Sequence, residues 1–198
     1  MPNLSVTRRR FLGAASSFAV WLAASPAELL AASTDDKLRS DRGAAPRYRV
    51  LTVAQAAAFD AFAVQVIPSE RGSPGAREAN VTRFADNGLS SFAKEQCADF
   101  VKAIDALNAE AIRLVPLASD FASLASVQQA DVMRSMDKSN HAAFEALRAP
   151  VITGMFANPS YGGNTRKVGW RLLGFDDRFY WQPPFGFYDQ RREARRRD

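Results

Sequence analysis

Residues 91–115 carry the longest amphipathic pattern of the sequence, and this pattern constrains the fold more than any other feature. Large apolar side chains recur there every three or four residues, the interval that places them on one face of an α-helix, and Pro116 ends the run. We therefore predict one helix over these residues. The side chains expected on its apolar face are Phe92, Cys97, Phe100, Val101, Ile104, Leu107, Ala111 and Ile112.

A capping pattern predicts another helix earlier in the chain. Thr52 and Gln55 have the spacing at which a threonine and a glutamine cap the first turn of a helix, and apolar residues at helical intervals follow them. Pro68 ends this helix, and residues 68–79 form a loop rich in proline and glycine. Helical periodicity then returns over residues 81–89.

Two more helices are predicted in the second half of the chain. Ser126 and Gln129 repeat the capping-box spacing ahead of one of them. The other, over residues 144–156, is expected to be kinked at Pro150, because proline lacks the N–H that a helix interior needs. Convincing period-two runs and internal repeats are both missing from the sequence. We therefore predict an all-α fold, a compact helical domain with an irregular C-terminal segment.

The irregular segment is rich in aromatic residues. Ten of the 21 aromatic side chains lie between residues 155 and 190, interleaved with glycines and prolines that prevent one long helix. These side chains must be buried, either around the helical core of this chain or against a partner, since aromatic residues are favoured at interfaces. We expect Trp170 to lie in the internal core. The side chains expected to face a partner are Trp181, Phe185 and Phe187.

Basic charge is concentrated at the two ends of the chain. The formal net charge is +5, yet residues 34–190 contain 18 lysines and arginines against 18 aspartates and glutamates. The excess comes from three consecutive arginines at residues 8–10 and from five arginines among the last eight residues. Nucleic-acid-binding domains carry their basic residues on a folded face, so we predict no nucleic-acid partner.

The residue inventory offers little for catalysis or for cofactor binding. Cys97 is the single cysteine and His141 the single histidine, so neither an iron–sulfur cluster, a c-type haem nor an ordinary zinc site can be assembled. Glycine-rich loops of the nucleotide-binding type are also missing from the sequence. We predict no catalytic, cofactor-binding or metal-binding residue in this chain.

Several single residues of types that occur in catalytic sites are better explained structurally. His141 is expected at a helix start or on the surface, and Cys97 as a small core residue. The adjacent carboxylates Asp176 and Asp177 are expected in a turn, because neighbouring side chains point in different directions. No nucleophile-elbow sequence surrounds Ser73, Ser135 or Ser139, so none of these serines is expected to act as a nucleophile.

The first 33 residues have the pattern of an export signal. A basic stretch, a short apolar run and then small residues describe a secretory leader. Arg8 and Arg9, with Phe11 and Leu12 after them, resemble the twin-arginine motif read by the twin-arginine translocase, although a general secretory leader remains the alternative. Residues 34–49 are polar and predict a flexible linker. Twin-arginine export often serves proteins that carry a cofactor, so a cofactor is expected in a partner exported with this chain.

Two segments of the body resemble one protein family. Residues 158–164 read Asn-Pro-Ser-Tyr-Gly-Gly-Asn, a Gly-Trp pair follows, and the loop at residues 68–79 is similar to a loop of the same family. The family is the gluconate 2-dehydrogenase subunit 3 family, the small subunits of membrane-bound sugar and sugar-acid dehydrogenases. The motif residues, read here as a structural turn, are Pro159, Tyr161, Gly162, Gly163, Asn164, Gly169 and Trp170.

The resemblance implies an accessory role. The chain would be a non-catalytic small subunit that supplies the leader and assists the maturation and export of a flavin-dependent catalytic subunit of the glucose–methanol–choline class. FAD would then lie in that partner, and complexes of this kind commonly include a multihaem cytochrome c subunit. The location implied is the periplasm, with membrane association through the complex. Residues 50–178 would form the family domain, and residues 179–198 an aromatic and then arginine-rich tail whose role stays open.

Two other classes of function remain as alternatives. One is an independent periplasmic enzyme that uses carboxylates together with Tyr161. The other is a binding module that applies the basic tail to an anionic lipid or polysaccharide surface.

Overall fold

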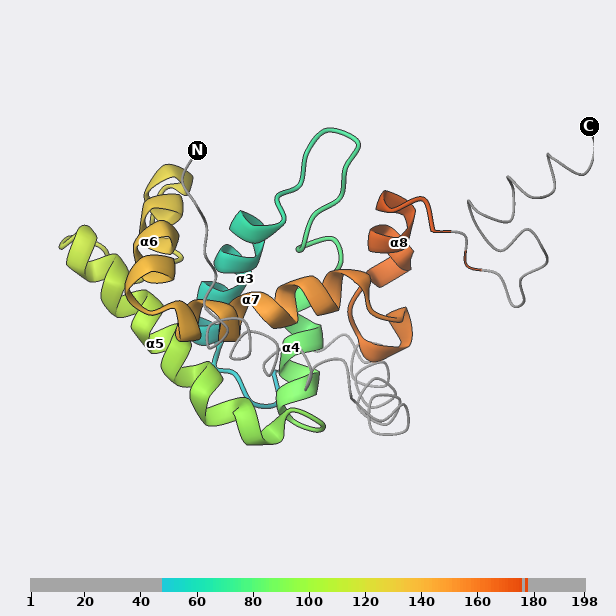
Figure 1. The fold of residues 1–198 in the computed structure, drawn as a ribbon, viewed down its shortest axis with the longest axis horizontal. Coiled ribbons are helices and arrows are strands. Elements are labelled where there is room, and N and C mark those ends of the chain that lie inside the picture. The colour runs from blue at the N-terminus through green and yellow to red at the C-terminus, as the bar shows by residue number, and fades with distance from the viewer. Residues whose placement is uncertain (1–47, 176, 178–198) are drawn as a thin grey trace, which may run out of the picture.

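Helix α7 (His141–Phe156) lies at the centre of the fold and contacts five other helices (Figure 1). The computed structural model describes residues 48–175 and residue 177, and within these the helical architecture confirms the all-α prediction. The helices around α7 are α3 (Val53–Val66), α4 (Val81–Leu89), α5 (Cys97–Leu114), α6 (Ser126–Ser139) and α8 (Val168–Leu172). Single 3-10 turns complete the described part, namely η1 (Lys94–Gln96), η2 (Pro159–Tyr161) and η3 (Thr165–Lys167).

Phenylalanines from several helices fill the core. Phe59 of α3 meets Phe100 of α5 edge to face, with 5.0 Å between the ring centroids, and Phe62 meets Phe144 of α7 in the same way at 5.5 Å. Aromatic pairs in this geometry add about 0.5–1.5 kcal/mol beyond the burial of their area. The core therefore ties α3 to both α5 and α7.

The capping box predicted for the first described helix is confirmed. The Thr52 hydroxyl accepts a hydrogen bond from the Gln55 N–H at 3.2 Å, and the Gln55 side chain accepts one from the Thr52 N–H at 3.0 Å. Helix α3 ends at Val66, two residues before Pro68. Both ends of α3 follow from local sequence alone.

The helix predicted over residues 91–115 begins later than expected, at Cys97. The preceding residues form turns because the hydroxyls of Ser90 and Ser91 donate to the Asn87 carbonyl at the end of α4, at 2.8 and 2.7 Å. Ile112, expected in the core, is 44% exposed, since the buried row of α5 runs through Leu107 and Ala111.

The second predicted capping box is wrong. Ser126 is already the first residue of α6, and the side chain that caps this helix is Gln128, whose Oε1 accepts from the Ala125 N–H at 3.0 Å. Gln129 is buried and bonds elsewhere: its Nε2 donates to the Phe121 carbonyl at 3.2 Å, and its Oε1 accepts from Gln65 at 2.9 Å. Gln129 thus connects α6 to α3 and to the α5–α6 connection instead of capping its own helix.

Helix α7 begins at His141, before the range that the sequence predicts, and contains Pro150 within it. Asn140 caps its start, with the side-chain oxygen accepting from the Ala143 N–H at 3.3 Å. The kink expected at Pro150 stays a prediction.

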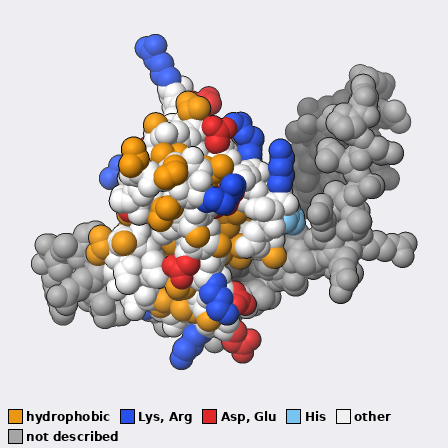
Figure 2. All heavy atoms as spheres, turned by 90° about the vertical axis from the view of Figure 1, so that its left-hand side faces the viewer, with side chains coloured by type: hydrophobic (Ala, Val, Ile, Leu, Met, Phe, Trp, Pro, Cys, Tyr) orange, Lys and Arg blue, Asp and Glu red, His pale blue; other side chains and the backbone are white. Residues whose placement is uncertain are grey.

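The end of the molecule formed by α6 and the last turns of α5 exposes scattered apolar side chains. Figure 2 faces this end and shows hydrophobic groups separated by neutral and charged ones. Leu117, in the α5–α6 connection, is 100% exposed, and Val127 of α6 is 74% exposed. Scattered exposed apolar side chains of this kind are normal on soluble proteins.

One ion pair between neighbouring turns of α5 makes stability depend on pH. Hydrogen bonds from the Arg113 guanidinium, at 2.7 and 2.6 Å, and one from Ser135 lower the pKa of Glu110 from 4.5 to about 2. A carboxyl whose folded pKa is depressed stabilises the fold above its unfolded pKa, and this stabilisation is lost as pH falls toward the folded value. As pH falls from about 5 to about 2, Glu110→Gln should therefore lose less of its free energy of unfolding than the wild-type chain.

Urea unfolding across that pH range measures the effect. Asp99→Asn, which changes an exposed carboxylate of the same helix paired with Lys102 at 3.5 Å, is the matched control. If the free energy of unfolding of Glu110→Gln falls with pH as much as that of the wild-type chain, the ion pair contributes nothing to the pH dependence.

Candidate functional site

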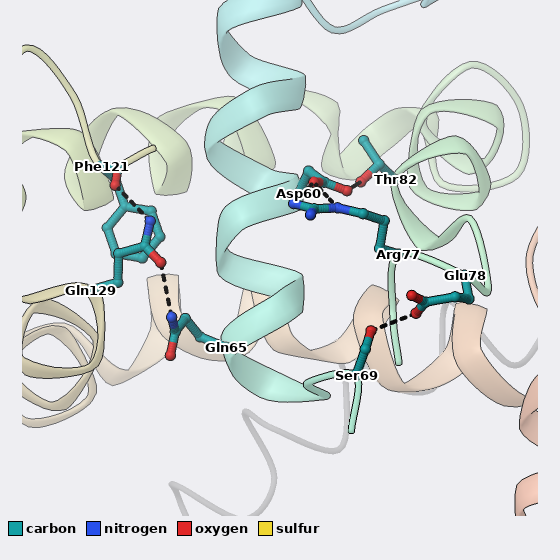
Figure 3. A network of polar contacts seen from close by, with 8 residues as sticks. All are labelled: Asp60, Gln65, Ser69, Arg77, Glu78, Thr82, Phe121 and Gln129. Atoms are coloured by element: carbon teal, nitrogen blue, oxygen red, sulfur yellow. Dashed lines mark hydrogen bonds and ion pairs between the residues drawn. The ribbon is translucent and has the colours of Figure 1, made fainter. Parts of the chain in front are cut away.

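The proline- and glycine-rich loop between α3 and α4 is held in one shape by polar contacts (Figure 3). The Glu78 carboxylate accepts from the Ser69 hydroxyl at 2.6 Å and from the Gly75 N–H at 2.8 Å, and these bonds lower the pKa of Glu78. At the tip, Glu70 and Ser73 exchange backbone hydrogen bonds at 2.8 and 2.9 Å. The loop is therefore built as a folded projection from the helical body.

The base of this loop is fastened to α3 by an ion pair, also drawn in Figure 3. The Arg77 guanidinium donates twice to one oxygen of Asp60, at 3.0 and 2.7 Å, and the Thr82 hydroxyl donates to the other at 3.4 Å. Asp60 thus joins the end of the loop and the start of α4 to the middle of α3.

The family-like motif begins as a tight turn after α7. The Asn158 side chain accepts from the N–H and the hydroxyl of Ser160, at 3.0 and 2.9 Å, and Pro159 starts η2. Tyr161 is partly buried against the core. Gly162 then takes φ 95°, a conformation that glycine adopts without strain, and its missing side chain leaves room for the Asn87 amide.

Asn87 itself is a buried residue without hydrogen bonds from its side chain. Neither its amide nitrogen nor its amide oxygen has a partner, although the residue is only 1% exposed. Buried polar groups without a partner are rare in native proteins. The amide packs against Gly162, which places this unusual group directly beneath the motif turn.

Asn164 is the residue that connects the motif to both neighbouring helices. It is fully buried at φ 45°, and its N–H donates to the Gly154 carbonyl of α7 at 2.8 Å. Its side chain donates to the Ala157 carbonyl at 2.9 Å and accepts from the Gly169 N–H at 2.8 Å. All of its polar atoms are thus used within the chain, which supports the interpretation of the motif as a structural turn.

Gly169 allows α8 to lie directly on the end of α7. A Cβ atom at this position would be 1.9 Å from the Met155 carbonyl oxygen and 3.0 Å from the Phe156 ring. Gly163 makes a similar close approach, since its Cβ would be 2.4 Å from the Gly154 carbonyl oxygen. Gly163 and Gly169 are therefore both required by backbone contact with α7.

Trp170 does not lie in the internal core, contrary to the sequence-based expectation. It is partly buried, and its indole Nε1 donates to the Phe156 carbonyl at 2.8 Å. The buried positions of α8 are Val168 and Gly169, because the close contact of Gly169 with α7 turns the next side chain to the flank of the helix.

The end of α8 is a Schellman motif. Gly174 has φ 65°, its N–H donates to the Arg171 carbonyl at 3.1 Å, and the Phe175 N–H donates to the Trp170 carbonyl at 2.8 Å. The rings of Trp170 and Phe175 meet edge to face with centroids 5.2 Å apart, which supplies the apolar contact that accompanies this motif. Sequence reasoning missed this stop, although a glycine after a short apolar run was its signal.

The two family-like segments meet in space. The N–H and the hydroxyl of Thr165 donate to the carbonyl of Ala79, at 3.2 and 3.4 Å, across 86 residues of sequence. Figure 1 shows the loop and α8 at the same end of the molecule, away from α6. We call this end, formed by residues 68–79 and 158–175, the motif face.

A buried carboxylate, which sequence reasoning missed, fixes the start of the folded body. Asp86 of α4 accepts from the N–H groups of Arg49, Val50 and Leu51, at 2.7, 3.0 and 3.0 Å, and is fully buried. Its negative charge also acts on a neighbouring group: burial lowers the pKa of Arg83, and the Asp86 carboxylate opposes this effect. An aspartate in a helical pattern gave no sign of partners 35–37 residues earlier.

Burial and charge also affect Tyr48, the first residue that the structure describes. Burial is the main cause that raises the pKa of its phenol, and the carboxylates of Asp60 and Asp86 raise it further. Both carboxylates thus disfavour the ionised form of the Tyr48 phenol.

The other residues considered as site candidates from the sequence make contacts that are ordinary for structural residues. His141 begins α7 with its Nδ1 2.7 Å from the Asp137 carboxylate, and Cys97 is partly buried at the start of α5. Asp177 forms an ion pair with Lys167. Across residues 48–175 and 177, no three His, Cys, Asp or Glu side chains gather as a metal site would require.

Three further sequence candidates have ordinary hydroxyl or backbone contacts. The Ser135 hydroxyl accepts from Arg113 at 3.2 Å, and the Ser139 hydroxyl donates to the Ser135 carbonyl at 3.0 Å. Ser73 takes part in the backbone pair at the loop tip.

Several predicted positions lie outside the described residues. These are the export motif Arg8, Arg9, Phe11 and Leu12, the proposed interface residues Trp181, Phe185 and Phe187, and Asp176.

Comparison with protein families matches residues 53–177 to the model described as gluconate 2-dehydrogenase subunit 3. The match covers most of the described body, including the loop and the turn that form the motif face. The chain belongs to the gluconate 2-dehydrogenase subunit 3 family. No curated protein and no solved structure matches the chain.

Membership in the subunit 3 family assigns the chain to a multisubunit dehydrogenase. The family model spans both segments on which the sequence resemblance was based, so the resemblance is confirmed. Within the described part of this subunit 3 protein, no helix has the length and apolar character needed to cross a membrane.

Proposed function

We propose that this chain is the non-catalytic small subunit of a periplasmic, flavin-dependent dehydrogenase of the glucose–methanol–choline class. The observation that carries the proposal is the family match over residues 53–177. The geometry of the motif supports it, because the polar atoms of Asn164 and the bare backbone of Gly163 and Gly169 are used to pack α8 on α7. Such a motif maintains a shape that a partner recognises.

The second part of the proposal concerns export. Arg8 and Arg9, followed by Phe11 and Leu12, supply a twin-arginine leader, and the catalytic subunit with its FAD crosses the membrane bound to this chain. The small subunit would also assist the maturation of that flavoprotein and stabilise it. A multihaem cytochrome c subunit completes the proposed complex and associates it with the membrane.

Exchange of the two leader arginines for lysine tests the export role. Arg8→Lys with Arg9→Lys keeps the charge but removes the guanidinium groups, which lysine does not replace in directed recognition. We expect both this chain and its flavoprotein partner to remain in the cytoplasm. Fractionation of the cells, followed by mass spectrometry and by the flavin absorption of the purified complex, measures the result.

Arg10→Lys, outside the arginine pair, is the matched control and should leave export unchanged. A partner flavoprotein that still reaches the periplasm in its normal amount with the double variant would refute the escort role.

A further inference from the structure

Two consecutive leucines at the end of α8 are exposed on the motif face. Leu172 is 43% exposed and Leu173 is 64% exposed, and Phe175, two residues on, is 47% exposed while its ring also packs on Trp170. We call Leu172, Leu173 and Phe175 the α8 patch. Large apolar side chains that lie together on the surface mark interaction sites more often than scattered ones do.

The backbone that leads to the α8 patch is strained. Asn164, Arg166 and Lys167 take φ values of 45°, 56° and 59°, although none of them is glycine. Such a conformation is unfavourable for a residue with a side chain and persists only where its surroundings fix it. Here the four hydrogen bonds of Asn164 and the Trp170 indole bond to α7 fix the segment. The fold therefore accepts a cost to set the position of α8.

Basic residues are close to the patch in the chain. Arg171 directly precedes Leu172 and is exposed, Arg166 is exposed, and Lys167, paired with Asp177, is half exposed. An apolar centre with a basic rim is complementary to an apolar surface with an acidic rim.

We propose that the α8 patch, with its basic rim, is the surface through which this chain binds the catalytic subunit of its dehydrogenase. The inference rests on the proposed function for the identity of the partner. It predicts a partner surface of apolar side chains bordered by aspartates and glutamates. A rigid apolar centre of this kind suits the few side chains that dominate the binding energy of an interface.

Two other occupants fit the patch less well. A second copy of the chain in a twofold dimer would place one basic rim against another, which is repulsive. A membrane surface favours a long amphipathic helix that lies flat in it, whereas α8 spans only Val168–Leu172.

The opposite end of the molecule supplies a matched control surface. Leu117 and Val127 are at least as exposed as the patch residues, but they lie on the α5–α6 connection and on α6. Figure 2 shows that apolar groups at that end of the molecule are separated by other side chains. Their environment lacks the strained backbone that positions α8.

The test measures binding of the full chain to the purified, FAD-loaded catalytic subunit. Leu172→Ser with Leu173→Ser should raise the Kd by about 100-fold, because interface energy concentrates in a few central apolar residues. Leu117→Ser with Val127→Ser should leave the Kd within about threefold of the wild-type value, as expected of residues outside the interface. Circular dichroism of each variant checks that its helices are intact.

A charge reversal provides an independent variant. Arg171→Glu leaves both leucines in place and should raise the Kd with a reduced dependence on salt, whereas Arg71→Glu on the loop tip should have a smaller effect. If the leucine variant loses helix content, the comparison of Arg171→Glu with Arg71→Glu decides whether the patch binds the catalytic subunit.

Each outcome bears on a definite statement. Variants of the α8 patch that bind like the wild-type chain would overturn the patch and leave the proposed function intact. Failure of the wild-type chain to bind the catalytic subunit would overturn both. Loss of binding to phosphatidylcholine–phosphatidylglycerol vesicles, or loss of self-association in sedimentation, with the subunit Kd unchanged, would reassign the patch to a membrane or to a second copy.

Discussion

Asp86→Ala is expected to lower the free energy of unfolding by about 3–5 kcal/mol, because it removes the acceptor of three backbone N–H groups at once. Those groups belong to Arg49, Val50 and Leu51, and the bond to Leu51 is buried. A buried donor left without a partner costs about 1–3 kcal/mol, and water would satisfy only the more accessible of the three. Arg83 would also lose the negative charge that offsets its burial.

Urea unfolding of the full chain, followed by circular dichroism, measures the effect. Asp86→Asn keeps one side-chain oxygen near Val50 and Leu51, so it should be less damaging than alanine. Asp99→Ala, an exposed aspartate on α5, is the control and should change stability little. Equal stability of the alanine variant and the wild-type chain would rule out a structural role for the carboxylate.

Gly169→Ala is the second change with a large expected effect, about 3 kcal/mol or more, at the upper end for overpacking. The added Cβ would lie 1.9 Å from the Met155 carbonyl oxygen and 2.9 Å from its carbonyl carbon. Backbone atoms cannot move aside as a flexible side chain does, so α8 must separate from α7. That movement would also break the bonds from Gly169 to Asn164 and from Trp170 to Phe156.

Limited trypsin digestion reads this local change, because opening of α8 exposes the bonds after Arg166 and Arg171. Gly174→Ala separates space from conformation: its φ is 65° and nothing lies within 4 Å of the added Cβ. Its cost should be only the left-handed penalty of about 1–2 kcal/mol. Digestion of Gly169→Ala at the wild-type rate, with unchanged unfolding, would contradict the close packing of α8 on α7.

Features set by neighbouring residues were predictable from the sequence. The Thr52–Gln55 capping box and the helix ends ahead of Pro68 and Pro116 depend on contacts within a few residues, which a sequence pattern contains. The turn expected at the motif is a local feature as well, formed by η2 and by Gly162 at φ 95°.

Features set by distant partners were not predictable. Gln129 had capping-box spacing but bonds to Gln65 and Phe121, which lie near it only in the folded chain. Trp170 was expected in the core because it follows the family-like turn, yet the contact of Gly169 with α7 turns it to the flank. In both cases a local preference was overruled by packing between elements.

The candidate site also combines features that the sequence predicts with features that depend on distant partners. The sequence identified the segments that form the motif face, but not that Thr165 joins one to the other at Ala79. It also gave no sign that Leu172 and Leu173 are exposed, because they look like core residues in an apolar run; the interface residues that it predicted beyond Asp177 lie outside the described residues. Exposure of a leucine is a property of the fold and has no local sequence signal.

The position of Asp86 has a mechanical consequence. A pull on the N-terminal segment would enter the fold at the three hydrogen bonds of Asp86 and load α4 first. Helix α4 supports the motif turn through Asn87 and Phe84, which contact Gly162 and Gly163. A force applied to a leader would therefore act on α4 and, through α4, on the motif face. Helix α6 does not lie on this path. Asp86, where the N-terminal segment is bound, and Phe84 and Asn87, which support the motif turn, thus lie on the same helix.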